Sequence, residues 1–363
     1  MSQQRSIWSR LYNGETSIRF VSRMKLWFLL SLAVIAIGMV SLFTRGLNFG
    51  IDFEGGTAWE VRAPGVSVSE ARDALRPVGM GDAKIQIIGD DLIRVQESAS
   101  DPAKSAQVTQ ALADLAKVPT NQVNLNEVGP SWGEEITNKA RQALIVFLIA
   151  ITIYISLRFE WKMAVATLVA LVHDILVTVG AYSLSGFEVT PATVIAGLTI
   201  LGYSIYDGIV VFDKVDENTR GLAASGRMTY GDMVNLSLNQ VLMRSLNTSI
   251  TALLPILSLL VVGGFVLGAT TLQDFALALL IGLTASAYSS IFIASPLLAL
   301  LKEREPRYAS IKERVLARGG TGAPLTPAAA AAALGGDGGD TPLRPTTAAP
   351  RTPPRPRKKG KRR

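Results

Sequence analysis

The chain has 363 residues, of which 48% are hydrophobic and only 18% are charged, and its mean hydropathy of +0.31 is high for a soluble protein. This composition, together with several apolar runs of about 20 residues, indicates a polytopic membrane protein and argues against one large soluble core. The chain contains no cysteine and one histidine, which excludes disulfides, thiolate nucleophiles, cysteine-bound metals and a histidine-rich metal site.

The N-terminal region combines a basic segment with a long apolar run. Residues 1–24 are polar and basic, and the apolar run Lys25–Thr44 follows them. A signal peptide has a similar layout, but this apolar core is long, and Arg45 and Gly46 follow it where a small-residue cleavage site would lie. We therefore favour a retained first transmembrane helix at residues 25–45 over a signal peptide.

Residues 46–136 break the hydrophobic pattern and predict a small α+β domain outside the membrane. Strand-like and helical patterns follow one another in the order β-α-β-β-α-β, which is that of a ferredoxin-like fold. In chain order these segments lie at Gly56–Ala63, Ser67–Val78, Ala83–Ile88, Leu92–Glu97, Pro102–Val118 and Gln122–Val128. Ser67 with Glu70 three residues later is a capping-box pattern, and residues 89–91 predict a hairpin turn.

Five further apolar runs predict transmembrane helices after this domain. They lie at Thr137–Leu157, Met163–Leu184, Thr190–Phe212, Val241–Leu260 and Leu272–Leu301. With the first span they predict a polytopic α-helical membrane protein, in which six transmembrane helices carry the ferredoxin-like domain between helices 1 and 2. Helices 2–6 then occupy residues 137–301. The polar segment Lys214–Gln240 is expected to form a helix along the membrane surface.

The distribution of basic residues predicts the orientation of the chain. The first 25 residues carry five basic groups against one acidic residue, and residues 302–363 carry 15 against 5. The loops at 185–189 and 263–271 contain no Lys or Arg. Under the positive-inside rule, both termini are cytoplasmic and the α+β domain is extracytoplasmic.

Residues 302–363 predict a largely disordered cytoplasmic tail. The segment is rich in Ala, Gly, Pro and Thr and ends in RPRKKGKRR, a composition that cannot bury enough apolar surface to fold. Its basic end fits contact with anionic lipid or ribosomal RNA. We favour the simpler interpretation of a solubilising tail that obeys the positive-inside rule.

Asp207 is the residue that most constrains function, because it lies within the fourth apolar run. A charge at membrane depth costs at least about 2.5–3.5 kcal/mol, so it needs a partner or a function. Thr199 and Tyr203 precede it at intervals of four residues and share its helix face. Arg244 opens the next apolar run at a matching depth, and we expect the two charges to pair. Asp207 would then load and release a proton under the influence of Arg244; the alternative is a static salt bridge that fixes helix register.

Other polar residues at membrane depth extend this path. The fifth run carries a polar stripe on an otherwise apolar surface, made of Gln240, Arg244, Asn247, Thr248 and Thr251. Such side chains can hold water along a proton path. His173 and Asp174 are adjacent in the middle of the third run, where either a proton relay or a structural hydrogen bond between spans is consistent with the sequence.

The sixth run has a small residue at every fourth position. These residues are Ala278, Gly282, Ser286, Ser290 and Ala294. Such a stripe allows close approach of another helix, from this chain or from a partner subunit. We therefore expect a packing role for it.

Three long segments of the chain resemble the SecF family, and they are FGIDFEGGT (Phe49–Thr57), Leu171–Arg220 and LNQVLMRSLNTS (Leu238–Ser249). SecF is the smaller half of the SecDF protein-export complex, a relative of the resistance-nodulation-division transporters. The resemblance runs from about Arg19 to Arg307. It implies six spans with a periplasmic domain between the first two, in the cell membrane, in agreement with the reading from hydropathy and charge.

The resemblance also implies partners and residue roles. It implies a heterodimer with SecD, attachment to the SecYEG channel, contact with the translocating preprotein, and YajC and YidC as further candidate partners. It implies that the proton-motive force helps to pull polypeptides across, with Asp207 and Arg244 as the coupling residues. The motif Asp-Phe-x-Gly-Gly-Thr occupies Asp52, Phe53, Gly55, Gly56 and Thr57. Its glycines permit a tight turn from the membrane into the first outer strand.

Other function classes make different demands on the chain. No Gly-x-Ser-x-Gly or His-Glu-x-x-His arrangement occurs in the sequence, so we expect no enzyme, cofactor or metal. A half-transporter of the resistance-nodulation-division type, exporting small molecules or lipids, would need a substrate cavity and normally twelve spans in one polypeptide. A purely structural scaffold for the channel would tolerate joint neutralisation of Asp207 and Arg244.

Overall fold

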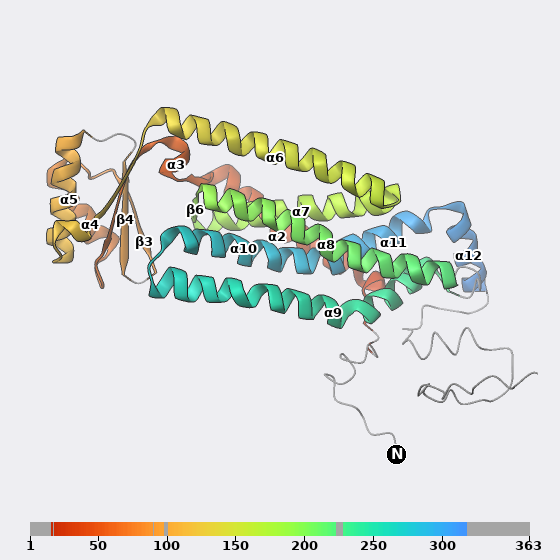
Figure 1. Cartoon of the computed structure of the whole chain (residues 1–363). Helices are drawn as coiled ribbons and strands as arrows, with labels where there is room; N and C mark the ends of the chain where they lie inside the picture. The colour runs from red at the N-terminus through yellow and green to blue at the C-terminus, as the bar shows by residue number, and fades with distance from the viewer. Residues whose placement is uncertain (1–15, 17, 90, 98–100, 223–227, 318–363) are drawn as a thin grey trace, which may run out of the picture.

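The computed structural model describes five stretches of the chain, which are residues 16, 18–89, 91–97, 101–222 and 228–317. They form a long helical bundle with a small α+β domain at one end, which we call the domain end (Figure 1). The opposite end, where η1 (Val21–Arg23) and α12 (Pro306–Ala317) lie, is called the terminal end.

Six helical stretches within the described residues are long and apolar enough to cross a membrane, which confirms the predicted number of spans. Helices suit this environment because they satisfy their backbone polar groups internally. In chain order the stretches are α2 (Met24–Arg45), α6 (Pro130–Arg158), α7 (Trp161–Ser185), α8 (Pro191–Leu222), α9 (Tyr230–Ser258) with the π-helical η4 (Leu259–Val266), and α10 (Thr270–Ser289) with the π-helical η5 (Ser290–Ala294) and α11 (Ser295–Glu303).

The predicted surface helix at Lys214–Gln240 is wrong. α8 continues through the first part of this segment, and α9 begins within its second part. Asn218 on α8 donates to Ser237 Oγ at 2.8 Å and to Gln240 Oε1 at 2.9 Å, both on α9. Polar residues here extend the two spans beyond their apolar stretches and pair them. Residues 223–227 of the segment lie outside the described residues.

The beginning of the predicted disordered tail is helical. α12 buries Tyr308, Ile311 and Val315 against the bundle, and the Tyr308 ring lies 4.8 Å from that of Tyr230 on α9. An apolar face of this spacing stabilises a short amphipathic helix. Residues 318–363, which hold the rest of the tail and its basic end, lie outside the described residues, as do residues 1–15 and 17.

The α+β domain has the predicted topology. Its antiparallel sheet has the order β3-β4-β2-β5, as in ferredoxin-like folds. In chain order the elements are β2 (Gly56–Arg62), α4 (Val68–Leu75), η2 (Arg76–Val78), β3 (Lys84–Ile88), β4 (Leu92–Glu97), α5 (Pro102–Ala116), η3 (Thr120–Gln122) and β5 (Asn124–Val128). The capping box is present, because Ser67 N–H donates to Glu70 Oε2 at 2.7 Å and Glu70 N–H donates to Ser67 Oγ at 3.3 Å. Residue 90 of the predicted hairpin turn is outside the described residues.

The two faces of this sheet differ in character, because successive side chains of a strand point to opposite faces. On one face Trp59 and Val61 are buried in an apolar core with residues of α4 and α5. The other face carries Glu60, Arg94 and Gln96, whose side chains reach the domain end of the bundle. The sheet therefore meets the membrane spans through polar groups.

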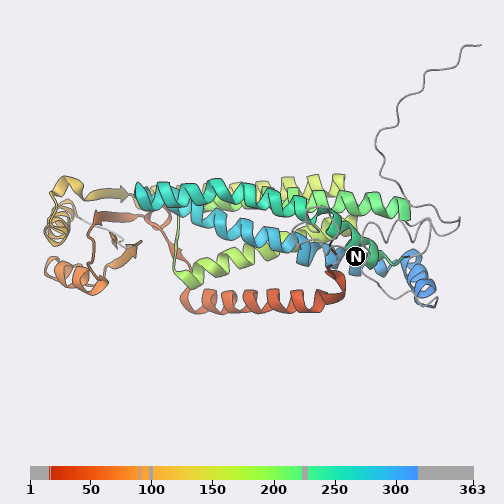
Figure 2. The same ribbon diagram turned by 90° about the horizontal axis from the view of Figure 1, so that it is seen from below.

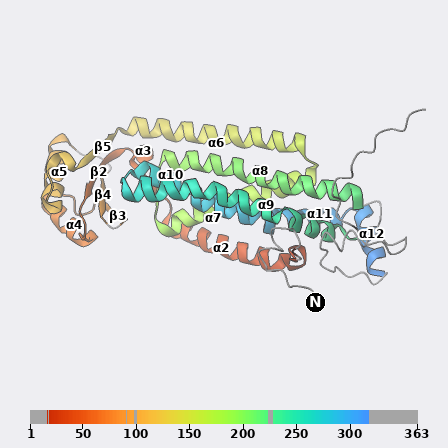
Figure 3. The same ribbon diagram turned by 60° about the horizontal axis from the view of Figure 1, so that its bottom comes forward.

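The bundle is organised around α10, which packs against α7, α8 and α9. α2 packs against α7 where Gly38 and Gly180 meet, and a Cβ added to Gly38 would lie 2.7 Å from Gly180 Cα. Paired glycines allow such close approach of two backbones. α2 lies along one edge of the bundle (Figure 2), and α6 lies along the opposite edge (Figure 3).

Candidate functional site

Asp207 lies within the apolar part of α8, and two serines from neighbouring segments hold its carboxylate. Ser245 Oγ on α9 donates to Asp207 Oδ1 at 2.5 Å, and Ser290 Oγ at the start of η5 donates to Asp207 Oδ2. Each carboxylate oxygen therefore has a donor, which offsets part of the cost of placing a charge in an apolar environment. The site joins the fourth, fifth and sixth spans.

The segment that carries Ser290 is wider than an α-helix. η5 is π-helical, and Pro296 lies just beyond it in α11. Proline has no N–H for the carbonyl four residues earlier, and its ring crowds that carbonyl, so the helix must adjust locally. Ser295 Oγ donates to the Ser290 carbonyl at 2.8 Å within this widened turn. Turns of this kind are frequent at functional sites.

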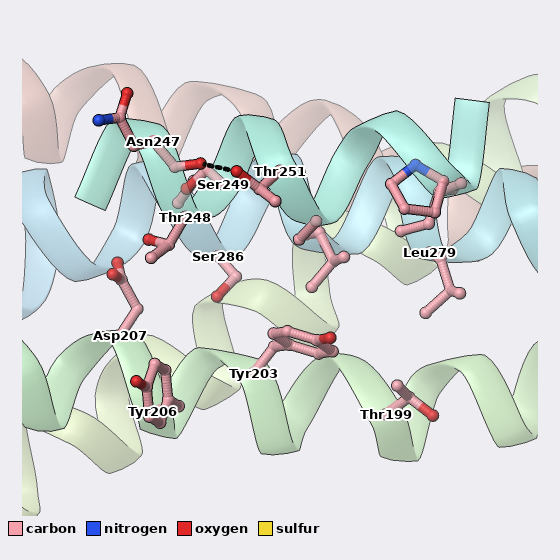
Figure 4. A pocket seen from close by; sticks show the side chains of 15 residues that line it. Thr199, Tyr203, Tyr206, Asp207, Asn247, Thr248, Ser249, Thr251, Leu279 and Ser286 are labelled. Atoms are coloured by element: carbon pink, nitrogen blue, oxygen red, sulfur yellow. Dashed lines mark hydrogen bonds between the residues drawn. The ribbon is translucent and has the colours of Figure 1, made fainter. Parts of the chain in front are cut away.

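Asp207 faces an open groove of about 630 Å³ between α8, α9 and α10. Figure 4 shows Asp207 and Tyr203 on one side of it, opposite Thr248 on α9. The exposed fractions of Tyr203 and Tyr206 are 48% and 55%, so the groove is open at the surface of the chain. Six of the polar residues predicted on the fourth and fifth spans line this groove, and they are Thr199, Tyr203, Asp207, Asn247, Thr248 and Thr251. Gln240 and Arg244 of the predicted stripe do not line it, and Gln240 instead accepts a hydrogen bond from Asn218.

Asp207 does not pair with Arg244, although both residues lie in the described part of the chain. Arg244 is exposed, and it forms no ion pair with any described residue. Neighbouring residues of an α-helix point about 100° apart, so Arg244 points away when Ser245 faces α8. Matching depth on adjacent spans was inferred from the sequence, but depth does not determine the rotation of α9 about its axis.

His173 and Asp174 on α7 belong to a second, buried polar network. Asp174 accepts a hydrogen bond from Ser204 Oγ on α8 at 2.7 Å. The His173 ring lies 3.1 Å from Asp174 Oδ1 and 3.1 Å from Ser31 Oγ on α2. Ser31 Oγ donates to Tyr288 OH on α10 at 3.3 Å. The network joins four spans. These contacts are compatible both with a proton relay and with a structural hydrogen bond between spans, so the relay through His173 and Asp174 stays a prediction.

The Asp52–Thr57 motif forms the passage from α2 into the sheet. Two short elements precede the first long strand, β1 (Asn48–Phe49) and α3 (Ile51–Glu54). The φ angles of Gly55 and Gly56 are +76° and +128°, in the region that favours glycine. The glycines therefore make the tight turn predicted for them.

Gly282 and Ser290 of the small-residue stripe on the sixth span face α8 of the same chain. Ala278, Ser286 and Ser290 are buried, and a Cβ on Gly282 would collide with the Ile200 side chain of α8. The stripe thus lets α8 and α10 approach closely. Ser290 also donates to Asp207, which small-residue spacing does not predict.

A third polar cluster, which sequence reasoning missed, lies where the sheet meets the domain end of the bundle. Arg94 on β4 forms ion pairs with Glu60 on β2 at 2.7 Å and with Glu188 on β6 (Glu188–Val189) at 2.6 Å. Gln96 Nε2 donates to the other oxygen of Glu188 at 2.8 Å. The sequence holds one signal that could have predicted this cluster: Glu188 is the one charged residue in the short loop 185–189 between two spans.

These side chains line a cavity of about 280 Å³ that Asp52 and Asp274 also face. Four carboxylates therefore surround one guanidinium. Burial, and then the charge of Glu188, raise the pKa of Asp52 above its ordinary value. Burial of Arg94 opposes its charge, but the carboxylates of Glu188 and Glu60 outweigh burial and raise the pKa of Arg94. Among the described residues, no cluster of His, Asp or Glu is arranged to hold a metal ion.

The chain matches two family models and several curated proteins. The model described as protein export membrane protein SecD/SecF, C-terminal, matches residues 107–304, and the SecD/SecF GG motif matches residues 40–62. The chain is 45% identical over 324 residues to the protein translocase subunit SecF of Streptomyces coelicolor, covering 89% of this chain and 87% of that protein. It is 41% identical over 330 residues to the SecF subunit of Mycobacterium tuberculosis, covering 88% of this chain and 75% of that protein.

The fold is also similar to solved structures. The crystal structure of SecDF from Thermus thermophilus, a translocon-associated membrane protein, matches with a TM-score of 0.72 and 35% identity, covering 80% of this chain and 39% of the solved chain. A crystal structure of SecDF in a super-membrane-facing form matches with a TM-score of 0.59 and 35% identity, covering 82% and 40%. This chain therefore spans about two fifths of the solved SecDF chains.

Proposed function

The chain belongs to the SecD/SecF family of protein-export membrane proteins, and we propose that it is an accessory subunit of the Sec translocation machinery. In this role it couples the proton-motive force to the export and membrane insertion of polypeptides. The observation that carries the proposal is the Asp207 carboxylate, which Ser245 and Ser290 hold beside an open groove, lined in part by hydroxyl groups, within the apolar part of the bundle. An ionisable group in such a position is expensive and is typical of a proton pathway.

Asp207 is the proton carrier in this proposal. The ionised carboxylate accepts both serine hydroxyls, whereas the protonated carboxyl is neutral and has a donor of its own, so its attraction to the two serines weakens. Because these serines lie on α9 and η5, protonation changes the forces between three spans. Thr199, Tyr203 and Thr248 provide hydroxyl groups along the groove that can hold water leading to Asp207.

A SecD-like subunit is the proposed partner over the groove. The exposed guanidinium of Arg244 lies near the start of the apolar part of α9, where lipid solvates a charge poorly. A second subunit that covers the groove would bury Arg244 beside an acceptor and close the proton path to lipid. The solved SecDF chains are more than twice as long as the matched part of this chain, which fits a partner that provides the remaining length.

The remaining assignments follow from the resemblance and the charge distribution. We place the protein in the cell membrane, with both termini cytoplasmic and the α+β domain outside. SecYEG and the translocating preprotein are further proposed partners, as are YajC and YidC, with anionic lipid for the tail. No catalytic reaction is assigned to the chain, because the proposed role transmits the energy of the gradient without hydrolysing a cofactor.

Co-purification tests the partner assignment. A tagged chain extracted from its own membranes is expected to recover a SecD-like subunit in stoichiometric amount. The variant Arg244→Gln is expected to lower this recovery about 10-fold, because loss of an interhelical polar contact in a membrane costs about 1–2 kcal/mol. The measurement is the ratio of the two subunits by quantitative mass spectrometry.

Arg158→Gln is the matched control for Arg244. Arg158 is also exposed at the end of a span, but it pairs with Asp213 of the same chain at 3.2 Å, so its loss should leave the recovery unchanged. The proposed function would be contradicted by two results together. The tagged chain would be recovered without a SecD-like subunit, and cells depleted of the chain would still export a secreted reporter normally. That outcome would favour a half-transporter of small molecules or lipids.

A further inference from the structure

The α+β domain is attached to the bundle by a group of side chains that we call the Arg94 cluster, made of the buried Arg94, Gln96 and Glu188 and the partly buried Glu60. Arg94 Nε and Nη2 both lie 2.7 Å from Glu60 Oε1, so the domain itself fixes the guanidinium. Its Nη1 then donates to Glu188 Oε2 at 2.6 Å. The Arg94 and Glu188 side chains are only 7% and 5% exposed, so removal of either partner leaves a buried charge uncompensated.

Glu188 lies directly before the span that carries Asp207. β6 ends at Val189, and α8 begins at Pro191. Thr190 and Thr193 bond to each other in the first turn of α8, which ties β6 to the helix. α8 is continuous from Pro191 through Asp207, a rise of about 24 Å at 1.5 Å per residue. A displacement of Glu188 therefore moves the start of α8, the helix that carries Asp207.

The segment that leaves α2 meets the same carboxylate. β1 and β6 pair in parallel, with Asn48 opposite Glu188, and Gly50 N–H donates to Val189 O at 3.0 Å. A Cβ on Gly50 would collide with the Glu188 carboxylate. The exit from the first span, the sheet of the α+β domain and the entrance to α8 are thus joined at one tightly packed point.

We infer that the Arg94 cluster couples movement of the α+β domain to movement of α8, so that neither moves without the other. We call the cluster in this role the joint. Arg94 and Glu188 are positioning residues in this scheme, because they act on Asp207 through the helix. The inference rests on the proposed function and deepens it. Through Glu188 the α+β domain is linked to the helix that carries Asp207.

A distance measurement between domain and bundle tests the joint. The chain has no cysteine, so spin labels can be attached at Gln107→Cys on α5 and Ser185→Cys at the end of α7, both exposed positions. Pulsed electron paramagnetic resonance on the full chain in its complex should give one narrow distance distribution. Arg94→Gln should broaden it, because loss of the buried pair lowers the docking equilibrium constant by about 100-fold. Arg76→Gln, at an exposed ion pair within the domain, should leave it narrow.

The same variants are then assayed for gradient-driven export. Arg94→Gln and Glu188→Gln should both lose the stimulation of export by a proton gradient, and Arg94→Lys should retain part of it, since lysine keeps the charge but not the forked geometry. Glu188→Gln lies on the bundle side and leaves the α+β domain intact, so it separates loss of the joint from misfolding of the domain. If these variants broaden the distance distribution and yet keep gradient-driven export, the inference is overturned. The proposed function is tested separately by Asp207→Asn.

Discussion

Replacing Asp207 with asparagine is expected to abolish the stimulation of polypeptide export by a proton gradient. Asparagine has nearly the size of aspartate and still accepts one serine hydroxyl, so α8, α9 and η5 should remain packed. It cannot bind and release a proton, however, and the proposed cycle then stops. Export into inverted membrane vesicles, measured with a gradient and after its collapse by an uncoupler, should proceed at the same rate in both conditions for Asp207→Asn.

Two further variants separate proton coupling from a general effect of charge. Asp207→Glu keeps an ionisable group in the groove and should retain part of the stimulation. Asp213→Asn removes an exposed carboxylate of the same helix, whose partner is Arg158, and should behave like the native chain. Full stimulation in Asp207→Asn would refute the assigned role of Asp207.

Replacing Gly38 with leucine is expected to separate α2 from α7. A Cβ at this position would lie 2.7 Å from Gly180 Cα, and a backbone atom cannot move aside as the end of a side chain can. Overpacking of this kind costs about 1–3 kcal/mol, and the upper end applies because the two helix axes must move apart. Thermal unfolding of the purified chain in detergent should show a lower midpoint, because contacts across this interface, such as that of Ser31 on α2 with His173 on α7, are weakened.

Gly202→Leu is the matched control for this substitution. Gly202 also lies inside a membrane helix, but a Cβ there meets no atom within 4 Å, so leucine fits without displacement. Both substitutions gain about the same helix propensity over glycine, roughly 0.5–1 kcal/mol. Equal unfolding midpoints for the two variants would show that the close approach of α2 and α7 at Gly38 and Gly180 is not needed for the packing of the bundle.

Most of the fold could be predicted from the sequence, because its signals are local. Runs of about 20 apolar residues predict spans whatever their neighbours are. Alternation of apolar residues and the capping pattern at Ser67 and Glu70 predict the order of strands and helices in the small domain. The span ends were less well predicted, because polar side chains such as Asn218 continue α8 past its apolar stretch and pack it on α9.

The partners of Asp207 could not be predicted, because they depend on the rotation of one helix against another. Hydropathy and charge predict the depth of Arg244 but not the side of α9 that faces α8. The widened turn at η5 that carries Ser290 depends on the response of the backbone to Pro296, which leaves no periodic signal. Helical spacing did predict that Thr199, Tyr203 and Asp207 share one face, and the three residues line one groove.

The Arg94 cluster was missed for a different reason. Glu60, Arg94 and Gln96 alternate with core residues along their strands, which is the usual pattern of a solvent-exposed sheet face. Only the tertiary structure shows that this face lies against the domain end of the bundle and that Glu188 meets it there. Isolated charges in short loops between spans are the signal to examine in related chains.

The most direct test of the central claim is proton movement itself. The complex of this chain with its SecD-like subunit would be reconstituted into liposomes with a pH-sensitive dye inside, and a membrane potential would be imposed. We expect proton uptake by liposomes with the native complex to exceed that of protein-free liposomes, and uptake with Asp207→Asn to fall to the protein-free rate. Equal proton uptake by the native and Asp207→Asn complexes would contradict the claim that Asp207 carries the proton.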